Sequence, residues 1–92
     1  MKEQYIQRKI IKWLESEGHY VVKVVNATKA GVPDIVACVN GKFVGIEVKT
    51  PETKNNVSPL QAHNLSEIIL SGGNSLVAWD LEQVKEFIEE LA

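Results

Sequence analysis

The chain has 92 residues, 45% of them apolar, which is enough for one small domain over residues 1–92 and too little for a second core. Its only cysteine, Cys38, excludes an internal disulfide framework, and we expect a buried thiol in a reducing compartment. The net charge of −2 hides a split, because residues 1–56 carry nine Lys or Arg against six Asp or Glu, whereas residues 57–92 carry one against six. The acidic total therefore does not exclude a nucleic-acid partner.

The first residues lack the apolar run of a secretion signal, and no segment is long and apolar enough to span a membrane. A single free cysteine is compatible with a reducing compartment. We therefore expect an intracellular, cytoplasmic protein without a membrane partner, located in the host cell if its source is a virus.

In chain order, the first predicted element is a helix over residues 3–17. Ile6, Ile10 and Leu14 recur at helical spacing, and Gly18 fits the position that ends such a helix. The β-branched segment at residues 19–26 predicts a short strand, and the stretch ATKAGVP after it is typical of a loop.

A hairpin is predicted next, because Asn40-Gly41 suits a two-residue type I′ turn, in which both central residues have positive φ. In that register Asp34 lies opposite Glu47 on the neighbouring strand. The strand period of two puts the charged residues on one face. The other face is then entirely apolar, with Ile35, Ala37, Val39, Val44, Ile46 and Val48.

The last three elements follow the loop PETKNN. Ser58 and Pro59 predict the start of a second helix, as N-cap and first helical residue, and Gly72-Gly73 ends it. The segment SLVAW predicts a fourth strand, and Asp80 caps a last helix over residues 81–91. The order αβββαβα, with a right-handed crossover that makes the third and fourth strands parallel, predicts an α/β fold with a four-stranded mixed sheet flanked by helices.

The pairing of Asp34 with Glu47 is the first sign of chemistry. Two carboxylates directly opposite each other on neighbouring strands repel, so we expect a cation between them. Mg²⁺ prefers carboxylate oxygens and commonly binds through one or two of them together with substrate phosphates. Zinc fits poorly, because the chain has one cysteine and its two histidines show no ligand spacing.

Lys49 follows Glu47 by two residues, so on a strand it lies on the same face, about 6.6 Å further along. A phosphodiester attacked by water gains negative charge in the transition state, which a metal ion and a lysine would stabilise. The trio of Asp34, Glu47 and Lys49 therefore indicates phosphodiester hydrolysis. The alternative is an exposed polar face with an ordinary Glu–Lys neighbour pair.

Glu3 and Gln61 are polar residues at the inward start of the first and second helices. Each is spaced so that it extends the apolar stripe of its helix towards the sheet. The alternative for Glu3 is a first-turn carboxylate favoured by the helix dipole, and for Gln61 a solvated first-turn side chain. Spacing alone favours these simpler interpretations.

The run GVPDIVACVNGKFVGIEVKT resembles the PD-(D/E)xK nuclease motif in its PD…ExK form, with Pro33-Asp34 and Glu47-Val48-Lys49 in place. Together with KAGVPDIV, SPLQ and the opening KEQYIQRKI, it is similar to the VRR-NUC family of that superfamily, in its small stand-alone form known from phages and bacteria. The similarity extends from Glu3 to the last strand. The Val-Arg-Arg motif that gives the family its name is absent.

The resemblance implies the restriction-endonuclease-like fold and a deoxyribonuclease that uses Mg²⁺ or Mn²⁺. By the same resemblance, Asp34, Glu47 and the backbone carbonyl of Val48 would be metal ligands. Lys49 would be the catalytic lysine, and Glu3 would reach the metal directly or through water.

Gln61 would be the helix glutamine of the family, which orients the catalytic lysine or the water. Lys29 and Lys54 lie in the two loops beside the site, where they would contact DNA phosphates without reading sequence. Ordinary loop solubility explains these two lysines equally well. Trp13 and Trp79 fit core positions better than base-stacking positions.

These observations predict a metal-dependent endonuclease that cuts branched double-stranded DNA, such as four-way (Holliday) junctions, as a homodimer. One alternative is an exonuclease or flap nuclease with the same metal site. Another is a catalytically silent DNA-binding module. The dimer interface is expected away from the metal site, at the edge of the first strand or on the outer side of the first helix, with candidates Tyr20 and Val22 or Tyr5, Ile11 and Trp13.

Overall fold

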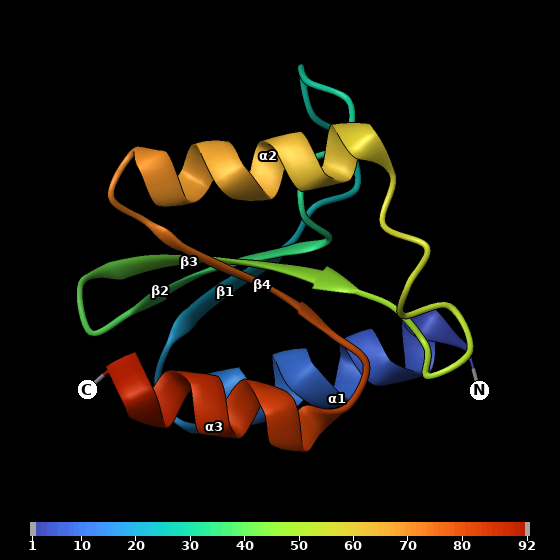
Figure 1. Cartoon of the computed structure of the whole chain (residues 1–92). Helices are drawn as coiled ribbons and strands as arrows, with labels where there is room; N and C mark the ends of the chain where they lie inside the picture. Colours follow the sequence, from blue (N-terminus) through green and yellow to red (C-terminus); the bar gives the residue numbers. More distant parts are fainter. Residues whose placement is uncertain (1, 92) are drawn as a thin grey trace.

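The structure is a computed structural model that describes residues 2–91. Its elements follow the order αβββαβα, as the sequence predicts. They are α1 (Glu3–Ser16), β1 (Tyr20–Lys23), β2 (Ile35–Val39), β3 (Lys42–Val48), α2 (Pro59–Leu70), β4 (Asn74–Ala78) and α3 (Leu81–Leu91). Figure 1 shows a central sheet with α2 over one face and with α1 and α3 against the other.

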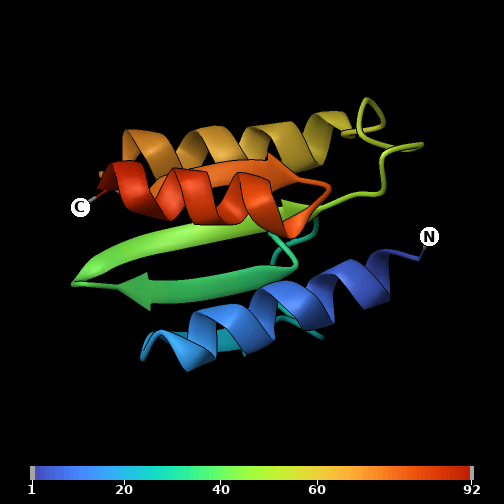
Figure 2. The ribbon, with the colours of Figure 1, turned by 90° about the horizontal axis from the view of Figure 1, so that it is seen from below.

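The sheet is mixed, with strand order β1-β2-β3-β4. The first three strands pair antiparallel, and β3 pairs with β4 in parallel, as the crossover through α2 requires. On the sheet face that α2 does not cover, α1 lies over the β1 side and α3 lies over the β4 side (Figure 2). The predicted α/β architecture is thus confirmed.

The turn between β2 and β3 fixes the register of the hairpin. Asn40 and Gly41 have φ of 50° and 80°, as a type I′ turn requires. Ile35 pairs with Ile46, and the pairing continues in the predicted register to the turn. Asp34 lies one residue before β2, at the open end of the hairpin.

The apolar face of the sheet forms the core with α1 and α3. Its fully or nearly buried members are Ile6, Ile10, Leu14, Ile35, Ala37, Val39, Val44, Ile46, Val48, Ala78, Val84 and Ile88. Each fully buried Val, Leu or Ile contributes about 1.5–3 kcal/mol to stability. The apolar stripes predicted for the first and last helices are both part of this core.

The helix ends carry the predicted signals. Gly18 follows α1 with φ of 86°. Ser58 Oγ accepts the N–H of Gln61 at 3.1 Å at the start of α2, and Asp80 Oδ1 accepts the N–H of Gln83 at 2.9 Å at the start of α3. Among residues 2–91, no helix is long and apolar enough to cross a membrane.

The first strand is shorter than predicted. It ends at Lys23 rather than near residue 26, and the last contact with β2 is the Val24 N–H, which donates to the Asp34 carbonyl at 2.8 Å. Beyond that point the chain leaves the sheet, and Val25 is exposed. The β-branched pattern alone could not show where the pairing partner ends.

The prediction of a buried Cys38 is wrong, because this side chain is exposed. Cys38 pairs with Tyr20 on one side and Phe43 on the other, on the sheet face towards α2. That helix packs over β3 and β4, and none of its residues is buried. The same face of β1 and β2 is therefore left open.

Candidate active site

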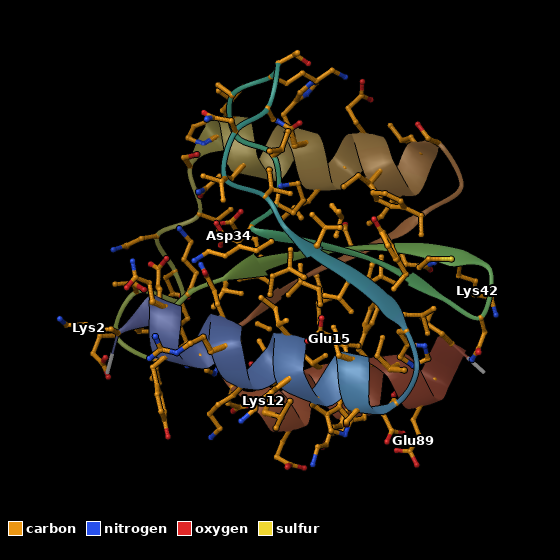
Figure 3. The ribbon with its side chains drawn as sticks, turned by 180° about the vertical axis from the view of Figure 1, so that it is seen from behind. Lys2, Lys12, Glu15, Asp34, Lys42 and Glu89 are labelled. Atoms are coloured by element: carbon orange, nitrogen blue, oxygen red, sulfur yellow. The ribbon has the colours of Figure 1, made fainter. Side chains whose placement is uncertain are left out.

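The two acidic residues predicted to hold a metal lie side by side at one end of the sheet. Asp34 is half-buried, and Glu47, on β3, is 2% exposed. Asp34 Oδ2 accepts a hydrogen bond from the Val48 N–H at 2.8 Å, which holds the carboxylate against the end of β3. Figure 3 shows Asp34 towards the same end of the molecule as Lys2, at the start of α1.

Two glycines let the loop that carries the first carboxylate lie against its neighbours. A Cβ at Gly45 would be 3.0 Å from Pro33 Cγ and 2.9 Å from Ile68 Cδ1, so β3 accepts both the loop and α2 because it has glycine there. Gly31 has φ of 81°, and a Cβ there would be 2.8 Å from Leu60 Cγ. The loop is thereby pressed between β3 and the start of α2.

The carboxylate pair is strongly coupled. Burial, followed by the charge of Asp34 and a hydrogen bond to it, raises the pKa of Glu47 from 4.5 to about 8. Lys49 lowers the pKa of Glu47, and Glu3 raises it further. At neutral pH the metal-free pair therefore holds a proton where the sequence predicts a cation.

Lys49 is 8% exposed, so it is not the solvated neighbour of the simpler interpretation. Its Nζ lies 3.9 Å from Glu47 Oε2 and donates a hydrogen bond to Gln61 Oε1 at 3.2 Å. The Gln61 Nε2 donates to the same Glu47 oxygen at 3.1 Å. The amide of Gln61 thus contacts both the lysine and the glutamate, as the family resemblance implies.

Gln61 is also part of the helix start. The Ser58 N–H donates to Gln61 Oε1 at 3.0 Å, while Ser58 Oγ accepts the Gln61 N–H, which together form a capping box. The Gln61 side chain is held by the helix cap and by the active-site contacts. It is therefore not the solvated first-turn side chain of the simpler interpretation. The start of α2 and the orientation of Lys49 therefore depend on one amide group.

The start of α1 brings two further polar side chains to this end of the sheet. Glu3 is half-buried, and its charge acts on Glu47. Gln7, one turn later, is 7% exposed, and within residues 2–91 its Oε1 has no hydrogen-bond partner. Sequence reasoning missed Gln7, although positions 3, 7, 10 and 14 follow one helical stripe that ends in Ile10 and Leu14.

The donor set fits one hard divalent cation. Asp34 and Glu47 supply two adjacent carboxylates, the number that Mg²⁺ commonly takes from a protein, and the carbonyl of Val48 follows Glu47 in the chain. In the described part of the chain, no three His, Cys, Asp or Glu side chains gather closely enough to hold a metal. Glu3 therefore does not join the pair as a third direct ligand in this arrangement.

The two predicted DNA-contacting lysines differ in their surroundings. Lys29 is exposed in the loop that leads to Asp34. Lys54 is also exposed, but its Nζ lies 5.2 Å from the centre of the Trp79 ring. A phosphate would have to compete with that ring for Lys54.

A further set of cations on α1 was not singled out from the sequence. Arg8, Lys9 and Lys12 line an open groove of about 450 Å³ together with Tyr5. Residues 2–12 carry four Lys or Arg against one Glu, whereas α3, on the same side of the sheet, carries four Glu against one Lys. Figure 3 labels Lys2 just before α1, Lys12 on α1 and Glu89 on α3.

Comparison with known proteins agrees with this geometry. The sequence model of the archaeal Holliday junction resolvase family, Hjc, matches residues 2–91. A solved structure described as a VRR_NUC domain superposes with a TM-score of 0.79 and 27% sequence identity, over 95% of this chain and 94% of that one. No curated protein sequence matches the chain. The two matches confirm the nuclease resemblance and the fold, and they support a structure-specific nuclease.

Proposed function

The chain belongs to the archaeal Holliday junction resolvase family, and from this membership and the site geometry we propose that it is a divalent-metal-dependent endonuclease that cuts four-way DNA junctions. The observation that carries the proposal is the half-buried Asp34 beside the buried Glu47, with the buried Lys49 held next to them. Removing ionisable groups from water together costs stability unless they are fully paired, so such a cluster points to a function. A cation between the carboxylates removes their repulsion.

We assign the metal to Asp34, Glu47 and the Val48 carbonyl, with Mg²⁺ or Mn²⁺ as the ion. When bound, such a cation would supply stabilisation of negative charge on the phosphodiester and would favour deprotonation of water. Asp34 and Glu47 hold their oxygens side by side before any ligand arrives. Little reorganisation is therefore needed on binding.

Lys49 is the residue that would contact the reacting phosphate. Its ammonium is held by Gln61 Oε1 and by Glu47, so it is aimed at the carboxylate pair rather than at solvent. A pre-oriented cation at that place stabilises the charge that develops on the phosphate oxygens. Gln61 acts through Lys49 and is a positioning residue.

Glu3 would act through water. It is near enough to Glu47 to raise the pKa of that carboxyl, but it is not one of a three-residue metal-holding group. Because Mg²⁺ usually keeps several waters, a carboxylate at this distance can hold the ion through its hydration shell.

For the DNA, we propose that Lys29 and the cationic face of α1 contact backbone phosphates. Lys2 lies at the same end of the molecule as Asp34, and Lys9 and Lys12 line a groove further along the helix. A positive track that begins at the metal site suits a duplex arm. Lys54 is a weaker contact because it already lies over Trp79.

We further propose that the enzyme is a symmetric homodimer, since resolving a four-way junction takes two nicks. The interface is the open sheet face formed by β1, β2 and the start of β3, where Tyr20 is 73% exposed, Phe43 is 48% exposed and Cys38 is also exposed. A contiguous apolar surface of this kind marks an interaction site. Of the other candidates from the sequence, Ile11 and Trp13 pack against the core, so they are not free for an interface.

The test of the activity is cleavage of four-way, flap, splayed and linear DNA with Mg²⁺, with Mn²⁺ and with a chelator. We expect metal-dependent cuts in the four-way junction and little cleavage of linear duplex. Preferential cutting of flaps or ends would favour the flap nuclease or exonuclease instead. Junction binding without any cleavage would favour the silent binding module.

The dimer is tested by light scattering and by mixing. Tyr20→Glu places a charge on the open sheet face and should give a monomeric mass, whereas Tyr5→Glu on the outer side of α1 should leave the mass of a dimer. Mixed dimers of wild-type and Glu47→Ala subunits should nick only one strand per binding event. A monomeric wild-type mass would refute the dimer while leaving the nuclease proposal standing.

A further inference from the structure

Gln7 is a buried polar residue that the proposed mechanism does not use. It lies on α1 at 7% exposure, among side chains of the apolar stripe, and its Oε1 has no partner within residues 2–91. A buried amide oxygen without a donor lowers stability, so a native protein rarely keeps one without a function.

The surroundings of Gln7 connect it to the metal site. Gln7 and Glu3 are four residues apart on one helix, so their side chains are neighbours. Both line an open depression of about 710 Å³, which also includes Lys23 at the end of β1 and Thr50, next to Lys49. Glu3 in turn acts electrostatically on Glu47. The unpaired amide therefore lies one helical turn beyond Glu3, in the same depression.

The chemistry of the unpaired atom limits what it can bind. An amide oxygen accepts hydrogen bonds and needs a donor, whereas the phosphate of a DNA diester has acceptor oxygens only. Lys23 also lines the depression, but it shows no hydrogen bond to Gln7 in the described structure. Oε1 itself is almost inaccessible in the metal-free structure, so of the possible donors only water, which is always present, is small enough to reach it.

We propose that Gln7 is a positioning residue of the nuclease site, whose Oε1 accepts a hydrogen bond from a water that the Glu3 carboxylate also holds. The inference rests on the proposed function, because the water belongs to the hydration shell of a divalent ion bound at Asp34 and Glu47. Glu3 and Gln7 fix this shell from the α1 side, as Gln61 fixes Lys49 from the α2 side. Outer groups of this kind typically change metal affinity or activity by about 10- to 100-fold.

The experiment compares Gln7→Met with a matched control, Gln4→Met. Methionine keeps the unbranched shape of glutamine without its amide, and Gln4 lines the same depression but is exposed. The readouts are Mn²⁺ affinity by calorimetry, single-turnover cleavage of a four-way junction, junction affinity in a chelator, and the melting temperature of the metal-free protein.

For Gln7→Met we expect Mn²⁺ affinity and cleavage rate to fall by about 10-fold or more, with unchanged junction affinity. The metal-free melting temperature should stay the same or rise, because an unpaired buried oxygen is removed. Gln4→Met should change none of these. Gln7→Glu keeps an acceptor oxygen at the same reach and should retain more of the cleavage rate than Gln7→Met.

Two results would overturn the inference while the nuclease proposal stands. One is wild-type metal affinity and cleavage in Gln7→Met. The other is a lower metal-free melting temperature in Gln7→Met with full Mn²⁺ affinity, which would make Gln7 a purely structural residue. If the wild-type protein itself neither binds Mn²⁺ nor cleaves the junction, the proposed function fails, and this inference fails with it.

Discussion

The two faces of β3 differ completely although their residues alternate along one strand. On one face Val44, Ile46 and Val48 are entirely buried against α1 and α3. On the other face Glu47 and Lys49 are nearly as inaccessible, at 2% and 8% exposure, but they are charged groups held by side chains of α2 and the Asp34 loop. Burial alone therefore does not separate core from active site.

The two faces differ in how the burial of their side chains changes the free energy of folding. The apolar face gains free energy from each side chain it buries. The polar face buries a carboxyl group beside a second acidic residue, and the raised pKa of Glu47, caused first by burial and then by the charge of Asp34, records the cost of doing so. One strand thus carries stability on one side and, on the other, a buried carboxyl group that keeps a proton until a cation replaces it.

The largest expected effect is on activity, from Asp34→Asn. The asparagine oxygen can still accept the Val48 N–H, but the charge that repels Glu47 is gone. Metal-dependent cleavage should be abolished, while the metal-free protein should be as stable as wild type or more stable. Chemical denaturation and a junction cleavage assay measure the two quantities. Full cleavage by a folded Asp34→Asn protein would refute the site.

On the opposite face, Ile46→Ala should lower the free energy of unfolding by about 2–5 kcal/mol, because it leaves a cavity at a fully buried position. No site residue is removed, so the single-turnover cleavage rate of the molecules that remain folded should be close to wild type at low temperature. A large loss of this rate with little loss of stability would show that the two faces are not separable.

Lys49→Ala should lower the single-turnover cleavage rate by about 100-fold with little change in DNA affinity, because the lysine acts on charge that develops in the transition state. Gln61→Ala should cost less in rate, since it only frees the lysine, but the Ser58 N–H loses its acceptor, which should weaken the start of α2 by about 1 kcal/mol. An unchanged rate for Lys49→Ala would make this lysine a structural partner of Glu47.

The last expected effect leaves the residues unchanged and is a pH dependence of the metal-free protein. Glu47 has a pKa of about 8 in the folded state against 4.5 without the fold, so between these values the folded state keeps a proton that the unfolded chain releases. The free energy of unfolding should therefore fall by up to about 1.4 kcal/mol per pH unit as the pH rises from 4.5 to 8, and the contribution should level off outside that window.

Glu47→Gln has no proton to lose, so its stability should lack this slope. Thermal unfolding of both proteins at several pH values, with a chelator present, isolates the contribution of one carboxyl group. Parallel curves for the two proteins would show that Glu47 titrates normally. The affinity for a divalent cation should rise over the same range, because the cation competes with the proton.

The sequence predicted the pairing of Asp34 with Glu47 because an Asn-Gly turn fixes the register on its own. Lys49 followed from the strand period. The three-way role of Gln61 could not be derived from spacing, since it depends on how α2 lies across β3, and only the family resemblance implied it. Gln7 needed the same tertiary information.

Cys38 is a residue for which the local sequence pattern gave the wrong prediction. Its apolar strand predicts burial, but which part of a sheet face is covered depends on where the crossover helix packs. The alternation of residues along a strand shows which side chains share a face. It does not show how much of that face a helix covers. The exposed part of that face became visible only with the positions of α2 and β1.

Through the capping box at Ser58, local opening of the start of α2 is linked to the position of the catalytic lysine. The Ser58 N–H is protected from solvent exchange by the Gln61 oxygen that also holds Lys49, so its proton can exchange only when that contact opens. Hydrogen exchange at this one backbone amide therefore reports how often the catalytic lysine is released from its position. A ligand that organises the site should slow exchange at Ser58, although the serine itself need never touch the DNA.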